Sequence, residues 1–207
     1  MAAPARNCRN QGRRRPARFG DTAAVSEAPS HWVWVDLEMT GLDPATCVIL
    51  ECALVVTDTE LVPLGSHEAV LAATDAELAV MAPVVRDMHQ KSGLIQRALA
   101  SRTTVAQAEA RLLELVAGLC APRTAVLCGN SVWQDRRFLE RYMPRLLAHL
   151  HYRIIDVSSL KVLVKAWRPD GVLDKGEKAH TAMADILGSI AELRHYRQLL
   201  FAPGARS

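Results

Sequence analysis

The chain has 207 residues, half of them apolar, which is enough for one domain with a sizeable core and too few for two full domains. Its longest apolar runs are interrupted by charges within a few residues, so the sequence predicts no membrane-spanning helix. The formal net charge of +3 is unevenly spread, because residues 1–30 hold six Arg and two acids while the other 19 basic and 20 acidic residues nearly cancel. A protein that grips long duplex nucleic acid carries a broad basic surface, so any nucleic-acid ligand here is expected to be short or held at a local site.

The five cysteines are odd in number, scattered, and without a C-x-x-C pair. This argues against a disulfide framework or a zinc site and favours a reducing compartment. Residues 1–30 lack apolar periodicity and are predicted to be a disordered basic tail without a secretory signal. We therefore predict a cytoplasmic protein, with a mitochondrial location as the alternative if the Arg-rich start is a transit peptide.

From Trp32 the pattern changes abruptly. Residues 32–35 and 48–57 are β-branched or apolar runs that predict two strands, with a turn signal at Asp43-Pro44 between them. A third strand within residues 61–72 would give an antiparallel opening. The stretch 75–119 is helical in character; Pro83 and Gly93 divide it, and Thr103 or Thr104 is expected to cap its longest piece.

The second half of the chain alternates between strands and helices. Residues 125–128 predict a short buried strand, which an amphipathic helix follows through Tyr142. Residues 153–156 predict another strand, followed by a helix to about Trp167, a polar loop over 169–178 and a last helix over about 181–200. Strands first, and then alternating strands and helices, predict one α/β domain over residues 31–207 with a mixed sheet covered by helices.

Two acids end the first predicted strand. Asp36 and Glu38 lie two residues apart, so the strand period puts both carboxylates on one face. Two like charges side by side are costly unless a cation lies between them. Taken alone, such a pair is more often a solvated strand end. Here it follows an apolar strand and leads into Thr40-Gly41, where backbone can approach a ligand.

Two later helices carry further candidates. Asp135 falls on the apolar stripe of the helix after residues 129–131. It is either an acid that needs a buried partner or a first-turn Asp favoured by the helix dipole. His180 and Asp185 flank the start of the last helix, where both can point into one cleft, although a lone His at a helix start is usually a surface residue.

Four acids and one His, converging from a strand and two helices, suit a site for two divalent cations. Hard oxygen ligands select Mg²⁺ or Mn²⁺ over zinc. Two ions about 3.5–4 Å apart stabilise the attacking and leaving oxygens of an in-line displacement. A neutral His titrates near the working pH and can take the proton from the attacking water.

Three segments of the sequence resemble the three motifs of the DEDDh exonucleases. They are Asp36-Leu-Glu-Met-Thr-Gly-Leu-Asp43, Gly129-Asn-Ser-Val-Trp-Gln-Asp135-Arg-Arg-Phe138 and His180-Thr-Ala-Met-Ala-Asp185. More narrowly, the first motif, Lys91-Ser-Gly-Leu94 and His151-Tyr-Arg-Ile-Ile-Asp-Val-Ser158 resemble oligoribonucleases, over about residues 32–201. The resemblance implies a ribonuclease H-like exonuclease fold, with a mixed β-sheet flanked by helices, and a homodimer. It also implies release of 5′-mononucleotides from the 3′ end of di- to about pentaribonucleotides.

The resemblance further implies roles for ten residues. Four acids would form the ligand set for two Mg²⁺ or Mn²⁺ ions: Asp36, Glu38, Asp185 and, completing it, Asp135. His180 would be the general base, and Leu42 would wedge against the bases. Four residues would close over the 5′ phosphate of the substrate, the middle two by reaching across the dimer: Ser131, Tyr152, Arg153 and Ser158. A walled-off 5′ end would explain a preference for very short RNA.

The chain departs from the family in places. Residues 61–75 and 169–178 match less well, and Ala184 stands where the family often carries a second acid before Asp185, which leaves metal affinity and the substrate loop open. Trp133 either stacks on a base or packs in the interior. Two alternative functions are a proofreading-type DNA exonuclease with the same acids and a non-catalytic nucleic-acid-binding module that kept the fold. The His-Tyr-Arg segment favours RNA, and the filled catalytic positions favour an enzyme.

Overall fold

The computed structural model describes residues 30–173 and 181–201. The predicted tail, apart from Ser30, and much of the predicted polar loop lie outside these residues. The strands of the described part are β1 His31–Met39, β2 Ile49–Asp58, β3 Pro63–Val70, β4 Ala125–Gly129 and β5 His151–Asp156. The helices are α1 Asp75–Ala79, α2 Pro83–Lys91, α3 Leu94–Ala100, α4 Val105–Leu119, α5 Val132–Tyr142, α6 Pro144–His149, α7 Val157–Trp167, η1 Pro169–Gly171 and α8 Ala182–Leu200.

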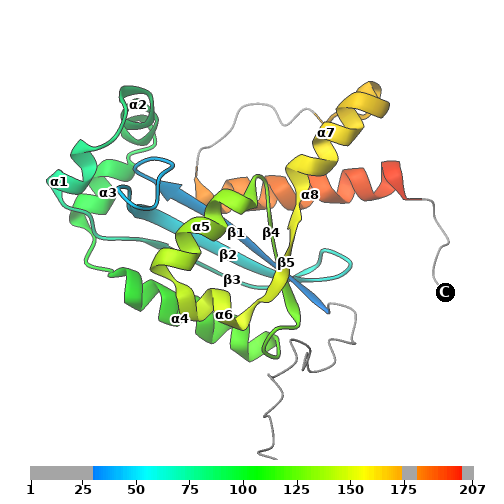
Figure 1. The fold of residues 1–207 in the computed structure, drawn as a ribbon, viewed down its shortest axis with the longest axis horizontal. Coiled ribbons are helices and arrows are strands. Elements are labelled where there is room, and N and C mark those ends of the chain that lie inside the picture. Colours follow the sequence, from blue (N-terminus) through cyan, green and yellow to red (C-terminus); the bar gives the residue numbers. More distant parts are fainter. Residues whose placement is uncertain (1–29, 174–180, 202–207) are drawn as a thin grey trace, which may run out of the picture.

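The strands form one mixed sheet in the order β3-β2-β1-β4-β5, with the α2 and α7 ends of the molecule at the top of Figure 1. β2 is antiparallel to β1 and β3, whereas β4 is parallel to β1 and β5. The predicted antiparallel opening and mixed sheet are therefore confirmed. Because β1, β4 and β5 run the same way, their carboxyl ends lie at one edge of the sheet, where α/β folds commonly place ligands.

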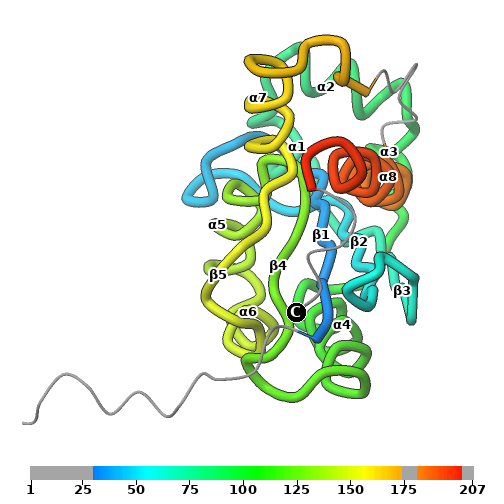
Figure 2. The backbone as a smooth tube through the Cα atoms, turned by 90° about the vertical axis from the view of Figure 1, so that its right-hand side faces the viewer, coloured from blue at the N-terminus to red at the C-terminus, as the bar shows by residue number. Residues whose placement is uncertain are grey.

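Helices cover both faces of the sheet, with α5 and α6 on one side and α8 on the other in Figure 2. Val33 and Val35 of β1 pack in one core cluster with α4, α5 and α6, while Trp34 packs in a second cluster with α7 and α8. A third cluster gathers α1 and α3 around Leu50. Successive side chains of a strand point to opposite faces, so Asp36 follows Trp34 to the α8 side. None of the described helices is long and apolar enough to cross a membrane.

Local signals set most of the element boundaries. Thr104 caps α4 by accepting a hydrogen bond from Gln107 N, in a complete capping box. β5 begins at His151, two residues earlier than predicted, and α6 was not predicted at all. α6 is too short to show a periodic pattern, and a side chain from another helix holds its start: Glu109 accepts the backbone N–H groups of residues 145 and 146.

Candidate active site

Three carboxylates meet at the carboxyl end of β1. One oxygen from each of Asp36, Glu38 and Asp185 lies within 4.8 Å of the other two, so the three can ligate a common cation. Asp185 occupies the first turn of α8, which begins after the N-cap Thr181. The register of β1 against β2 shifts between Glu38 and Met39, and such bulges re-aim side chains beside functional sites. All three acids are half-buried, so water screens their mutual repulsion only in part.

Asp135 lies deeper than these three acids. Its side chain is 6% exposed, and its Oδ1 accepts a hydrogen bond from Leu37 N at 3.0 Å. Burial first, and then the charge of Asp36, raise the pKa of Asp135 well above its ordinary value, while the Leu37 N–H acts in the opposite direction. The expectation of an acid with a buried partner is confirmed, and Asp135 also stands in the first turn of α5. Asp135 is close enough to Asp36 to feel its charge, but it is not part of the three-acid group.

His180, the predicted general base, lies outside the described residues. The structure reveals another histidine beside the acids, His89 of α2, which is buried. Its Nε2 lies 2.9 Å from the carbonyl oxygen of Met39, and its Nδ1 lies 3.9 Å from Glu38 Oε2. Burial lowers the pKa of His89, which favours the neutral form of this ring beside Glu38. Sequence reasoning missed this residue, since nothing distinguishes it from other polar residues of a short helix.

The loop after β1 carries Leu42, whose side chain is 71% exposed. The Leu42 carbonyl oxygen accepts hydrogen bonds from the side chains of Gln134 and Arg137 on α5. The Tyr142 hydroxyl donates to the carbonyl oxygen of Cys47 at 2.7 Å, farther along the same loop. The helix that contributes Asp135 thus also holds the loop that presents Leu42. These holding residues were not predicted, because their contacts join segments far apart in the sequence.

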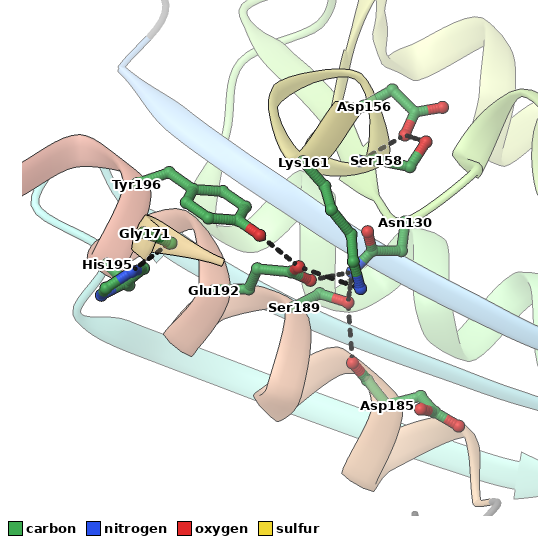
Figure 3. Close-up of polar contacts among 10 residues, drawn as sticks. All are labelled: Asn130, Asp156, Ser158, Lys161, Gly171, Asp185, Ser189, Glu192, His195 and Tyr196. Carbon is green, nitrogen blue, oxygen red and sulfur yellow. Dashed lines mark hydrogen bonds and ion pairs between the residues drawn. The ribbon is translucent and has the colours of Figure 1, made fainter. Parts of the chain in front are cut away.

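Ser131 and Ser158 are joined by one carboxylate. Oδ1 of Asp156 accepts hydrogen bonds from Ser131 N at 2.9 Å, Ser158 N at 3.0 Å and Ser158 Oγ at 2.6 Å, the last of which is drawn in Figure 3. Ser131 has a left-handed backbone, with φ of 53°, which is uncommon outside glycine. Gly129 lies just before this turn, and a Cβ there would be 2.9 Å from the carbonyl oxygen of Val35. The sequence did not predict that Asp156 binds both serines, although Asp156 lies within the segment 151–158 that resembles oligoribonucleases.

Tyr152 and Arg153 lie on β5, an edge strand of the sheet. Both are exposed, and the Arg153 guanidinium carbon lies 5.3 Å from the centre of the Tyr152 ring, within range of a cation–π contact. They therefore present an aromatic and cationic surface to the outside.

Trp133 on α5 is 54% exposed, so the prediction that it packs in the interior is wrong. The alternative, that it stacks on a base, stays a prediction.

Comparisons with known proteins agree with this geometry. Residues 33–193 match the RNase T family, whose description is exonuclease. An oligoribonuclease from Thiobacillus denitrificans is 48% identical over 173 residues, which cover 82% of this chain and 94% of that protein. The chain belongs to the oligoribonuclease family. Another oligoribonuclease, from Streptomyces avermitilis, is 49% identical over 175 residues, with 83% of this chain and 87% of that protein covered. As a member of this family, the chain is an exonuclease. Its three-acid group is a site that fits a divalent metal ion.

Solved structures place the fold of this oligoribonuclease-family chain among exonucleases. An exonuclease I from Methylocaldum szegediense superimposes with a TM-score of 0.63 at 20% identity, covering 81% of this chain and 40% of that chain. E. coli exonuclease I in complex with a dA16 oligonucleotide gives a TM-score of 0.62 at 20% identity, covering 81% and 41%. The chain thus spans about two fifths of these larger proteins. At this identity the likeness shows the fold alone, and it confirms the predicted ribonuclease H-like arrangement.

Proposed function

We propose that this protein is a metal-dependent 3′→5′ exoribonuclease that degrades di- to about pentaribonucleotides to 5′-mononucleotides. One observation carries this proposal: Asp36 and Glu38 lie beside Asp185, which is nearly 150 positions later in the chain. One oxygen of each carboxylate lies within 4.8 Å of the other two, and a divalent cation among them would relieve the repulsion of these half-buried charges. The relatives that match over most of their length bear the name oligoribonuclease, which supports short RNA as the substrate.

Two Mg²⁺ or Mn²⁺ ions are the proposed cofactors. Asp36, Glu38 and Asp185 offer hard oxygen ligands, and Asp135, whose pKa the charge of Asp36 affects, would complete the set. When bound, the ions would stabilise negative charge on the attacking and leaving oxygens of the cleaved phosphodiester. His180 accepts the proton of the attacking water at a ring nitrogen, and it directly precedes the N-cap of the helix that carries Asp185.

Leu42 and the four 5′-phosphate residues are the proposed substrate contacts. The exposed side chain of Leu42 supports a wedge against the bases, and its loop is anchored to α5. Asp156 holds the backbone of Ser131 and Ser158 in place, and Arg153 would bind the terminal phosphate through charge-assisted hydrogen bonds. A closed 5′ side restricts the enzyme to very short chains.

A homodimer is the proposed assembly. Three large apolar side chains stand out from β5 and α7: Tyr152 is 65% exposed, Val162 67% and Trp167 68%. α7 extends from the body of the molecule in Figure 1. Exposed apolar residues of this size, gathered on neighbouring elements, are typical of a protein interface. A second copy against this surface would bring Tyr152 and Arg153 towards the partner's site.

The proposed compartment is the cytoplasm, and the proposed layout is a basic tail over residues 1–30 and an exonuclease domain over 31–207. Four free, buried cysteines in the described part support a reducing environment: Cys47, Cys52, Cys120 and Cys128.

The test is the cleavage of a 5′-phosphorylated diribonucleotide and of a 5′-labelled pentaribonucleotide with Mg²⁺, Mn²⁺ or EDTA. We expect mononucleotides from the diribonucleotide, a ladder of products that shortens from the 3′ end of the pentaribonucleotide, and no product in EDTA. Asp36→Asn should lower kcat by roughly 10²-fold or more. The matched control is Glu140→Gln, which removes an exposed acid from α5 and should leave kcat unchanged.

Each rival function has its own outcome in the same experiment. Faster cleavage of the matching deoxyribonucleotides would identify a DNA exonuclease. Binding of the labelled RNA without product under every metal condition would identify a non-catalytic module. Wild-type turnover by Asp36→Asn would remove the three-acid group from the mechanism.

A further inference from the structure

A second carboxylate group of α8 is fully buried and has no role in the proposed chemistry. Glu192 stands seven residues after Asp185, two helical turns along the same side of α8. Its Oε2 accepts a hydrogen bond from Asn130 Nδ2 at 3.0 Å, and its Oε1 accepts one from the Tyr196 hydroxyl at 3.0 Å. Lys161 Nζ lies 3.5 Å from the same Oε1 (Figure 3).

These partners come from three different parts of the fold. Asn130 belongs to the turn between β4 and α5, Lys161 to α7 and Tyr196 to the next turn of α8. Burial and the contact with Glu192 raise the pKa of Tyr196 to about 12, so its hydroxyl stays a donor. A buried carboxylate is costly unless donors surround it, and each of these described groups offers a donor to Glu192. Glu192 thus fastens α8 to α7 and to the β4–α5 turn.

The same cluster reaches the backbone of Asp185. Asn130 Nδ2 also donates to Ser189 Oγ at 2.8 Å, and Ser189 Oγ donates to the Asp185 carbonyl oxygen at 2.8 Å. Figure 3 shows this series of contacts running from Glu192 through Asn130 and Ser189 to Asp185. Hydrogen bonds are directional, so this series restricts how α8 can rotate about its axis and slide past the turn that carries Asn130. Apolar packing alone leaves such small shifts less restricted.

We propose that Glu192 is a positioning residue that, through Asn130 and Ser189, holds the first turn of α8 where Asp185 faces Asp36 and Glu38. This inference rests on the proposed metal site. Misplacement of one ligand by about 1 Å can cost on the order of 10²-fold in rate, so the position of α8 controls turnover.

Glu192→Gln tests the proposal with the shape of the side chain preserved. The amide has one acceptor oxygen in place of two, so either Asn130 or Tyr196 loses its acceptor, and Lys161 loses its counter-charge. We expect Mn²⁺ affinity to fall at least about tenfold and kcat about 10–100-fold, with KM for a dinucleotide nearly unchanged. Mn²⁺ binding is measured by electron paramagnetic resonance of the free ion, well below the melting temperature of each variant.

Glu109→Gln is the matched control. Glu109 is another buried carboxylate, but it accepts backbone N–H groups at the start of α6. Its replacement should lower thermal stability while Mn²⁺ affinity stays within about twofold of wild type. Ser189→Ala is the second test variant, because it breaks the link to the Asp185 carbonyl and leaves the charge pairing of Glu192 intact. We expect about a three- to tenfold loss of Mn²⁺ affinity from Ser189→Ala, and little further loss when it is added to Glu192→Gln.

A Glu192→Gln protein that melts earlier but binds Mn²⁺ within about twofold of wild type would overturn the proposal and leave Glu192 a purely structural residue. If Glu192→Gln does not fold, unchanged Mn²⁺ affinity in Ser189→Ala would overturn it equally. Asp36→Asn separates this inference from the proposed function. If Asp36→Asn binds Mn²⁺ as tightly as wild type, the metal site itself is wrong, and the positioning role falls with it.

Discussion

Replacing Asp135 with Asn is expected to make the metal-free protein more stable and the enzyme nearly inactive. The Asp135 side chain is only 6% exposed, and its Oδ1 accepts a hydrogen bond from Leu37 N. Burial and the charge of Asp36 raise the pKa of Asp135 well above 3.8. An Asn keeps an acceptor oxygen for Leu37 N and removes the charge.

The size of the effect follows from two opposing contributions. A buried ion costs several kcal/mol in effective desolvation, and a hydrogen bond to a charged group returns about 1.5–3 kcal/mol. Ionised Asp135 should therefore destabilise the metal-free fold by about 2 kcal/mol. In a domain of this size each kcal/mol shifts Tm by about 2–4 °C, so Asp135→Asn should raise Tm by about 4–8 °C.

The effect should depend on pH with a definite sign. The folded-state pKa of Asp135 lies above its unfolded value, so the stability associated with its protonated form is complete below the unfolded pKa. That stability is lost as the pH rises through the folded-state pKa. The Tm advantage of Asp135→Asn should consequently be small near about pH 4 and largest near about pH 8.

Metal should narrow this difference in stability. At a hundredfold excess over its dissociation constant, Mn²⁺ stabilises the wild type by about 2.7 kcal/mol. Asp135→Asn should gain less, because an anionic group of the site is gone. Differential scanning calorimetry in EDTA and in Mn²⁺, at both pH values, measures this narrowing, and dinucleotide cleavage measures the loss of activity. Glu140→Gln on the same helix is the control and should change neither. A lower Tm of Asp135→Asn in EDTA at the higher pH, or a Tm difference independent of pH, would refute the reasoning.

Three further predictions concern the base, the tail and the 5′ end. His180→Asn should lower kcat on a dinucleotide by about 10²–10⁴-fold with little change in KM, and an unchanged steady-state kcat would assign the base elsewhere. Removal of residues 1–30 should leave kcat/KM on dinucleotides unchanged, since the first strand begins at His31; a large loss in a folded truncation would show that the tail completes the site. Arg153→Ala should slow cleavage of 5′-phosphorylated dinucleotides far more than that of a pentamer, because it removes a cation from the proposed phosphate contact. Equal losses on both lengths, measured by product quantification, would contradict that contact.

Features that depend on short-range rules could be predicted from the sequence. Side-chain period placed Asp36 and Glu38 on one face of β1, and the capping pattern located the start of α4 at Thr103 or Thr104, of which Thr104 is the cap. The position of Asp135 on an apolar stripe left two interpretations, a buried acid with a partner and a first-turn Asp, and the structure shows that both hold. These features need only the geometry of one strand or helix, so the residues within that element contain the information.

Which distant groups meet depends on how the strands pair and the helices pack. Asp135 accepts a hydrogen bond from Leu37, which is 98 positions away in the sequence. Glu192 accepts one from Asn130, which is 62 positions away. α6 depends on Glu109 from another helix for the hydrogen bonds at its start. A buried hydrogen-bond partner produces no periodic pattern in the sequence, because a single donor or acceptor is enough. That group comes into contact only after the strands have paired and the helices have packed. Local rules therefore give the elements and the faces of the acids, whereas the order of strands and the packing of α5 and α8 bring those acids together.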